Sequence, residues 1–154
     1  MSREVTVLTK ETNRLLDVFP DTIWPMPHLH RRLARLLLHL PEPRMRDINH
    51  AIEYLDAAHA AMRGWNNDEP RPITLALLLD MLTAHSEALK TMHAEVVGWK
   101  NDPRTISHLS QASETLDTAR EDVRELFGRD GGVMVDLVEK WGRKLERLEK
   151  AVGV

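Results

Sequence analysis

Hydrophobic residues recur along most of the chain in alternating steps of three and four. Between residues 44 and 65, for example, the hydrophobic positions with this spacing are Ile48, Ala51, Leu55, Ala58 and Met62. In an α-helix such positions share one face, and a sustained heptad-like spacing favours helices that cross at about 20°. No segment alternates hydrophobic and polar residues for long enough to indicate a strand. The pattern therefore predicts an all-α fold.

Proline and glycine fall almost entirely between the periodic segments and divide the chain into about six predicted helices. Short connections make consecutive helices antiparallel. We expect an up-and-down helical bundle in a single domain, with four long antiparallel C-terminal helices and two shorter N-terminal helices packed across them. The predicted domain covers residues 1–154, and the predicted helices cover residues 3–18, 27–40, 44–65, 72–98, 104–128 and 132–152.

One phrase occurs twice, 34 residues apart: HAAMRGWNNDEPRPI at residues 59–73 and HAEVVGWKNDPRTI at residues 93–106. We interpret most of this internal repeat as signals that end one helix and begin the next. Asp102 followed by Pro103 is typical of a helix N-cap with proline in the first turn. Whether the repeat records a duplication or two similar corners is left open by one sequence.

The glycines of the phrase predict where two helices end. Gly64 and Gly98 are expected in the left-handed conformation that commonly follows the last helical residue. The tryptophan after each glycine would then pack back on a small residue one turn earlier, Ala60 or Ala94.

Arginines lie near three predicted helix starts, at Arg44, Arg71 and Arg104. The helix dipole disfavours a cation at this end, so another interaction must offset the cost. We expect a salt bridge to an acidic residue at the same corner. The alternative is an anion held between the guanidinium and free backbone donors.

The segment HLHRRLARLLLHL, residues 28–40, predicts a helix with a basic stripe beside a leucine stripe. Such a stripe can dock on an acidic helix, bind phosphates or lie on an anionic membrane. The side chains that stack on bases in single-strand binding proteins are missing from it. We predict partner or anion binding by six residues: His28, Arg31, Arg32, Arg35, His39 and Arg44.

An acidic face in the predicted helix 104–128 offers a simpler role for the basic stripe. Its residues are Glu114, Asp117, Glu121 and Glu125. The two stripes could neutralise each other inside the fold or across a dimer, and this alternative stays open beside binding of another molecule.

The histidines suggest only weak metal candidates. Asp56 and His59 have the i, i+3 spacing that di-metal bundles use, but the second copy of the phrase has Lys90 and His93 there, and lysine is no ligand for such a site. His85 interrupts an otherwise apolar face. We interpret it as a core histidine bonded to a neighbouring polar group, with a pH-sensitive or catalytic imidazole as the alternative. We expect no cofactor.

Composition narrows the class of protein. The 154 residues carry a net charge of -3, which argues against a globally basic nucleic-acid binder. There is no cysteine, the first residues do not resemble a secretory signal, and the apolar run ITLALLL is too short to span a membrane, so we expect a cytoplasmic protein. Fifteen arginines against six lysines favour a GC-rich bacterium or its phage as the source.

Motifs for enzymatic chemistry are missing from the sequence. It has no nucleophile elbow, P-loop, dinucleotide-binding or kinase signature. We therefore predict a non-enzymatic protein-protein interaction module, such as an adaptor, regulator or assembly component, which binds another protein or itself. One alternative is a regulator that binds nucleic acid or another polyanion through residues 27–40. The other is a metal-dependent enzyme with histidine and aspartate ligands inside the bundle.

Overall fold

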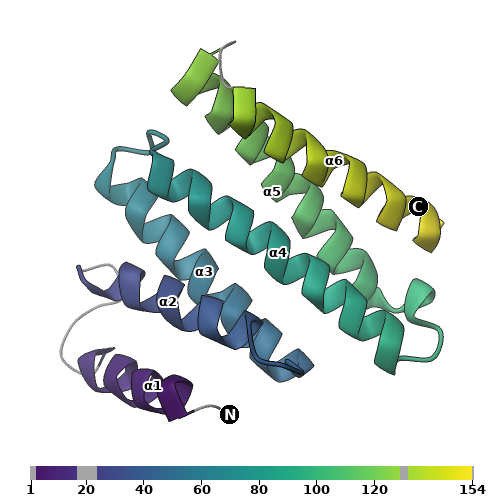
Figure 1. Ribbon diagram of the computed structural model, residues 1–154, viewed down its shortest axis with the longest axis horizontal. Helices are drawn as coiled ribbons and strands as arrows, with labels where there is room; N and C mark the ends of the chain where they lie inside the picture. The colour runs from purple at the N-terminus through teal and green to yellow at the C-terminus, as the bar shows by residue number, and fades with distance from the viewer. Residues whose placement is uncertain (1–2, 17–23, 129–131, 154) are drawn as a thin grey trace. The chain divides into compact units, whose positions relative to one another are not determined.

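The computed structural model describes residues 3–16, 24–128 and 132–153, and these ranges are mostly helical (Figure 1). The described helices pack against one another, which confirms the predicted all-α helical bundle. No strand occurs in the described ranges. The helices are α1 (Arg3–Leu16), α2 (Met26–Leu38), α3 (Met45–Trp65), α4 (Pro72–Glu95), the 3-10 helix η1 (Trp99–Asn101), α5 (Pro103–Phe127) and α6 (Gly132–Val152).

The predicted helix boundaries agree with these bounds to within three residues, apart from the end of the first helix. The predicted end at residue 18 lies outside the described residues. The largest difference inside them is at α4, which ends at Glu95 rather than at residue 98 because Val96 adopts an extended conformation. The proline and glycine positions were therefore sufficient to place most helix ends.

The chain divides into two compact units, Met1–Glu69 and Pro70–Val154. In the first unit α2 packs on α3 and α1 packs on α2. The rings of His30 in α2 and Tyr54 in α3 stack with their centroids 5.3 Å apart. The single domain expected for residues 1–154 stays a prediction.

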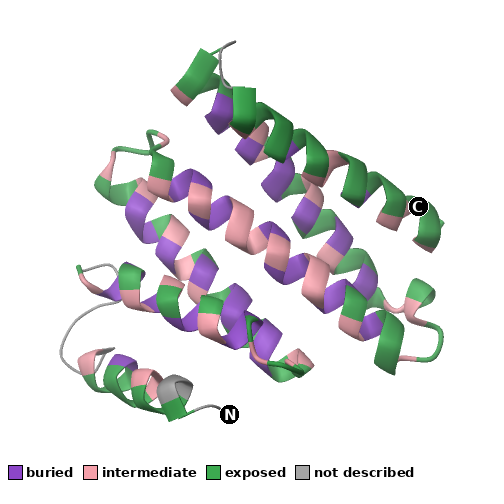
Figure 2. Cartoon of the chain, in the orientation of Figure 1, coloured by how far each residue is buried: buried purple, intermediate pink, exposed green. Residues whose placement is uncertain are grey.

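In the second unit α5 runs antiparallel to both α4 and α6 (Figure 1). α5 packs against each of these two helices. Figure 2 shows buried residues following one side of each helix, with fewer of them on α6. The buried cluster is aliphatic throughout: Leu75, Leu78, Leu82, Leu89, Leu109, Ala112, Leu116, Ala119, Val123, Val138 and Leu145.

The connection from α4 to α5 confirms part of the interpretation of the repeated phrase. Gly98 has φ +73°, the predicted left-handed conformation. The Asp102 carboxylate accepts a hydrogen bond from the Arg104 backbone N–H at 2.9 Å, which confirms the predicted N-cap. The Trp99 ring contacts His93, with centroids 4.8 Å apart, while Ala94 is exposed. In this copy of the phrase, His93 therefore packs against the Trp99 indole.

The first copy of the phrase ends its helix differently, and the prediction for Gly64 was wrong. α3 continues through Gly64 to Trp65, and the positive φ values follow at Asn67 (54°) and Asp68 (61°). Asparagine and aspartate tolerate this conformation better than other residues with side chains, so the helix need not end at the glycine. The Asp68 N–H donates to the Arg63 carbonyl at 2.8 Å and completes the helix end.

Alanine at the two glycines should therefore have opposite effects on stability. Nothing lies within 4 Å of a Cβ added at Gly64, which is helical, so Gly64→Ala should raise the free energy of unfolding by up to about 0.5 kcal/mol. Gly98→Ala should lower it by about 1 kcal/mol, because a Cβ is strained at positive φ. Urea denaturation of both variants measures the difference, and two changes of equal sign would contradict the assignment.

Candidate functional site

The basic stripe predicted from the sequence lies on the exposed side of α2. Its helix buries Leu33, Ala34 and Leu37, so the residues one half-turn away face solvent. Four of the six predicted binding residues line one hollow of about 270 Å³, together with Leu36. We call these four the basic surface: His28, Arg31, Arg32 and Arg35.

The other two predicted residues do not line this hollow. His39 follows the last residue of α2, and its ring Nδ1–H donates to the Arg35 carbonyl oxygen at 2.6 Å. Arg44 precedes α3, and its backbone N–H donates to the Asp47 carboxylate at 3.1 Å. Both residues thus take part in helix ends.

The other two arginines at helix starts are Arg71 and Arg104. Arg104 forms the expected salt bridge. The Arg104 guanidinium lies 2.9 Å from the Asp102 carboxylate, which also caps α5. The pKa of Asp102 is lowered first by the side-chain hydrogen bond from Arg104. The Arg71 backbone N–H donates to Thr74 Oγ1 at 2.9 Å.

The acidic face of α5 is exposed at all four predicted residues: Glu114, Asp117, Glu121 and Glu125. Asp117 Oδ1 lies 3.7 Å from the Arg120 guanidinium on the same helix. Docking of this face on the basic stripe stays a prediction.

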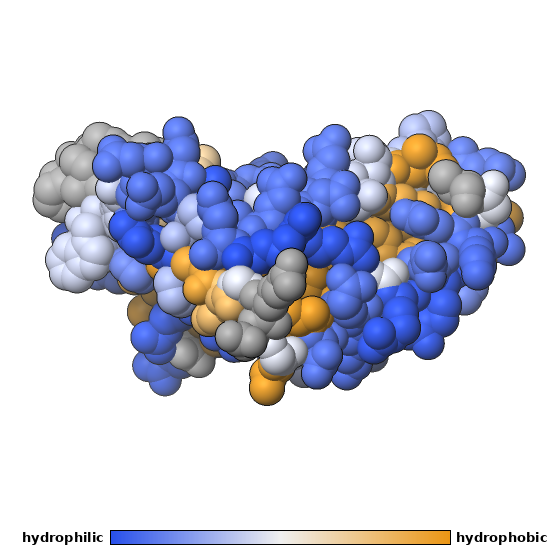
Figure 3. Space-filling model, turned by 90° about the horizontal axis from the view of Figure 1, so that it is seen from above, coloured by the Kyte–Doolittle hydropathy of each residue, from blue (hydrophilic) through white to orange (hydrophobic). Residues whose placement is uncertain are grey.

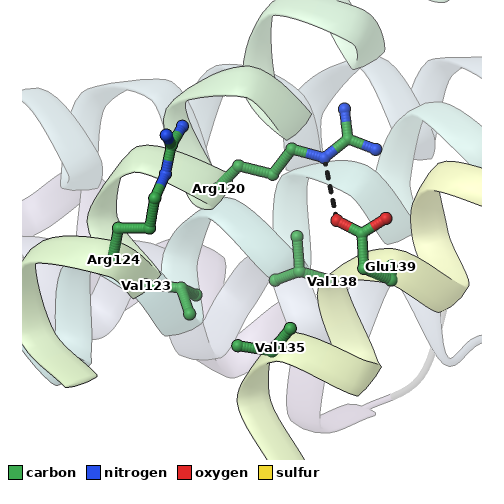
Figure 4. Close-up of a pocket in the computed structure, with 6 residues that line it drawn as sticks. All are labelled: Arg120, Val123, Arg124, Val135, Val138 and Glu139. Carbon is green, nitrogen blue, oxygen red and sulfur yellow. Dashed lines mark hydrogen bonds and ion pairs between the residues drawn. The ribbon is translucent and has the colours of Figure 1, made fainter. Parts of the chain in front are cut away.

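A second surface, not predicted from the sequence, lies between α5 and α6. A hollow of about 230 Å³ has valines on its floor and charged side chains at its edge (Figure 4). We call it the α5–α6 groove, and its lining residues are Arg120, Val123, Arg124, Val135, Val138 and Glu139.

The two arginines at the edge of the groove differ in their contacts. Arg120 Nε donates to Glu139 Oε1 at 3.2 Å and so ties α5 to α6. In Figure 4 the Arg124 guanidinium points away from this pair. This contact joins two helices, so it could not be read from the spacing of residues along one helix.

The beginning of α6 exposes hydrophobic side chains beside the groove. α6 buries only Val138 and Leu145 among its described residues, while Val133 is 81% exposed and Val135 and Leu137 are each 37% exposed. Figure 3 shows a mostly hydrophilic face that is interrupted by hydrophobic side chains. Exposed apolar groups next to a hollow are typical of surfaces that bind other proteins.

His85 is buried as predicted and contacts a histidine that the sequence reasoning missed. Its Nδ1 lies 3.1 Å from Nδ1 of His108 in α5, so one ring donates and the other accepts. Burial lowers the pKa of His85 to about 4, and the charge of His108 contributes further. Both rings therefore stay neutral near pH 7, as expected for a bonded core histidine.

The weak metal candidates come from two different helices. Asp56 and His59 lie on α3 and His85 lies on α4. Burial raises the pKa of Asp56, with the charge of Glu53 contributing, and burial lowers the pKa of His59, with the charge of Arg63 contributing. Among the described residues, no group of three or more histidine, aspartate or glutamate side chains could hold a metal ion.

The described residues thus define a helical-bundle protein with two candidate interaction surfaces, one on α2 and one between α5 and α6. Neither a protein-family model, nor a curated protein, nor a solved structure matches the chain. None of the helices in the described ranges is long and apolar enough to cross a membrane.

Proposed function

We propose that this chain is a non-enzymatic protein-protein interaction module, acting in the cytoplasm as an adaptor, regulator or assembly component. It binds an acidic surface of a protein partner through the basic surface of α2. The supporting observation is the hollow of about 270 Å³ around which His28, Arg31, Arg32 and Arg35 lie.

The composition of the basic surface favours a protein over a nucleic acid. Leu36 adds an aliphatic side chain to the hollow, and arginine combines charge with a planar, weakly hydrated group suited to interfaces. α2 has no phenylalanine, tyrosine or tryptophan on which a base could stack. The net charge of -3 would oppose the approach of a polyanion to the rest of the chain.

Binding of nucleic acid or another polyanion is the second candidate function. Three arginines and a histidine around one hollow could also hold phosphate groups. This candidate predicts an affinity that falls steeply with salt concentration, because bound arginines release counterions from the polyanion.

A pull-down from the source lysate, with and without nuclease, tests both candidates. The Arg32→Glu/Arg35→Glu variant should lose the bound protein, because it reverses two charges at the hollow. The control is Arg3→Glu/Arg147→Glu, which makes the same charge change at exposed positions on α1 and α6.

Nuclease-resistant binding that survives in the control and is lost in the α2 variant supports the interaction module. Recovery of nucleic acid, with the protein signal lost after nuclease, supports the second candidate instead. Equal binding by both variants would show that the basic surface is not the binding site.

A further inference from the structure

The α5–α6 groove combines an apolar floor with a guanidinium at its edge. Val123 and Val138 are buried beneath it, and Val135 is 37% exposed at its side. Within the part of the chain that the structure describes, no ion pair joins Arg124 to an acidic group. Figure 4 shows the Arg124 side chain standing at the edge of the groove. An acidic group from outside the molecule could therefore meet it there.

The same edge of α5 also carries an acidic residue, Glu121. In a second copy of the chain, this carboxylate could be the group that meets Arg124. Glu121 is exposed and precedes Arg124 by three residues, so the two lie on neighbouring positions of one helix face. Among the described residues Glu121 has no ion-pair partner either. If two α5 helices lie antiparallel across a two-fold axis, Arg124 of each faces Glu121 of the other. The edge is thus complementary to itself.

We propose that the α5–α6 groove binds a second copy of this chain in a two-fold symmetric pair. Arg124 of each copy pairs with Glu121 of the other, and the two Val135 side chains are covered between them. The residues that line this groove are different from those of the basic surface of α2.

The two kinds of contact have different roles in the pair. Exposed ion pairs contribute little to affinity, but like charges brought together oppose association and so fix the register. Coverage of Val135 and the neighbouring exposed side chains provides the apolar contribution. A small interface of this kind predicts weak association, in which monomer and dimer exchange as concentration changes.

Charge reversal in sedimentation-equilibrium experiments on the full chain tests the pair. The unmodified protein should shift from monomer to dimer between micromolar and near-millimolar concentration. Arg124→Glu alone and Glu121→Arg alone should each weaken association by roughly tenfold or more, because each places like charges across the axis. A one-to-one mixture of the two variants should associate again, since the carboxylate introduced in the first would face the guanidinium introduced in the second.

Two valines provide a matched test of the apolar contact. Val135→Ser should also weaken association, whereas Val97→Ser should not, because Val97 is 103% exposed in the connection after α4 and lies away from the groove. Circular dichroism of each variant at low concentration verifies that its helices are intact.

Each result decides the proposal. Recovery of the dimer in the mixture, with the two valine variants differing, supports it. A protein that stays monomeric at every concentration, a mixture that fails to associate, or equal effects of the two valine changes would overturn it. None of these results alters the pull-down test of α2, so the two proposals can fail separately.

Discussion

Acidification from pH 7 to pH 4 should lower the free energy of unfolding of the C-terminal unit by up to roughly 3 kcal/mol through His85 alone. The unfolded chain binds a proton at His85 near the ordinary histidine pKa of 6.5, while the folded chain does so only near pKa 4. Between these values the unfolded state binds more protons. The contribution of neutral His85 is therefore present above pH 6.5 and is lost as the pH falls toward 4.

The bonded pair explains why this cost is large. A proton on His85 places a charge beside Leu82 and Leu89, both almost fully buried on the same helix. Burial also lowers the pKa of His108, with the charge of Arg104 contributing, so the second ring is not readily protonated in place of the first. If both rings were protonated, two N–H groups 3.1 Å apart would face each other without an acceptor.

Denaturant unfolding at several pH values between 7 and 4 measures the effect. His85→Leu/His108→Leu replaces both partners with apolar groups and should reduce the pH dependence, while the contributions of the carboxylates stay in both proteins. Equal slopes for the two proteins would contradict the assignment.

Leu145→Ala should destabilise the C-terminal unit by about 2–5 kcal/mol, because it leaves a cavity where α6 packs on the core. Leu145 is 7% exposed, and it is one of only two buried residues among those described in α6. Leu137→Ala on the same helix provides the control: Leu137 is 37% exposed, so its loss should cost less than about 1 kcal/mol. Denaturation midpoints at unchanged slope give both values, and equal losses would show that α6 does not pack as described.

The helices could be predicted from the sequence because each depends on local signals. Hydrophobic spacing marks the buried face, and Asp102 with Pro103 marks a helix start through bonds that lie within a few residues. Gly64 shows the limit of this reasoning. Glycine can be helical or left-handed, and here Asn67 and Asp68 take the positive φ values instead.

Some residues of the candidate sites could likewise be predicted from local signals, whereas others depend on contacts between helices. His28, Arg32 and Arg35 could be grouped because residues on one helix face follow from the helical repeat alone. His108 and the α5–α6 groove depend on the register between helices, which one sequence does not specify. The sequence did contain a signal for the contact between His85 and His108. The two residues lie at comparable numbers of residues from Gly98, His85 backwards along α4 and His108 forwards along α5, so an antiparallel pair of helices brings them close together.

The sparse packing of α6 implies that this helix can open locally while the rest of the C-terminal unit stays folded. Among the described residues of this helix only Val138 and Leu145 are buried, whereas α4 and α5 share most of the apolar cluster. Backbone amides of α6 should exchange with solvent through local unfolding that leaves α4 paired with α5. A molecule held in the α5–α6 groove would add its binding free energy to the closed state of α6. The terminal helix would then change from the most labile element of its unit to a protected one.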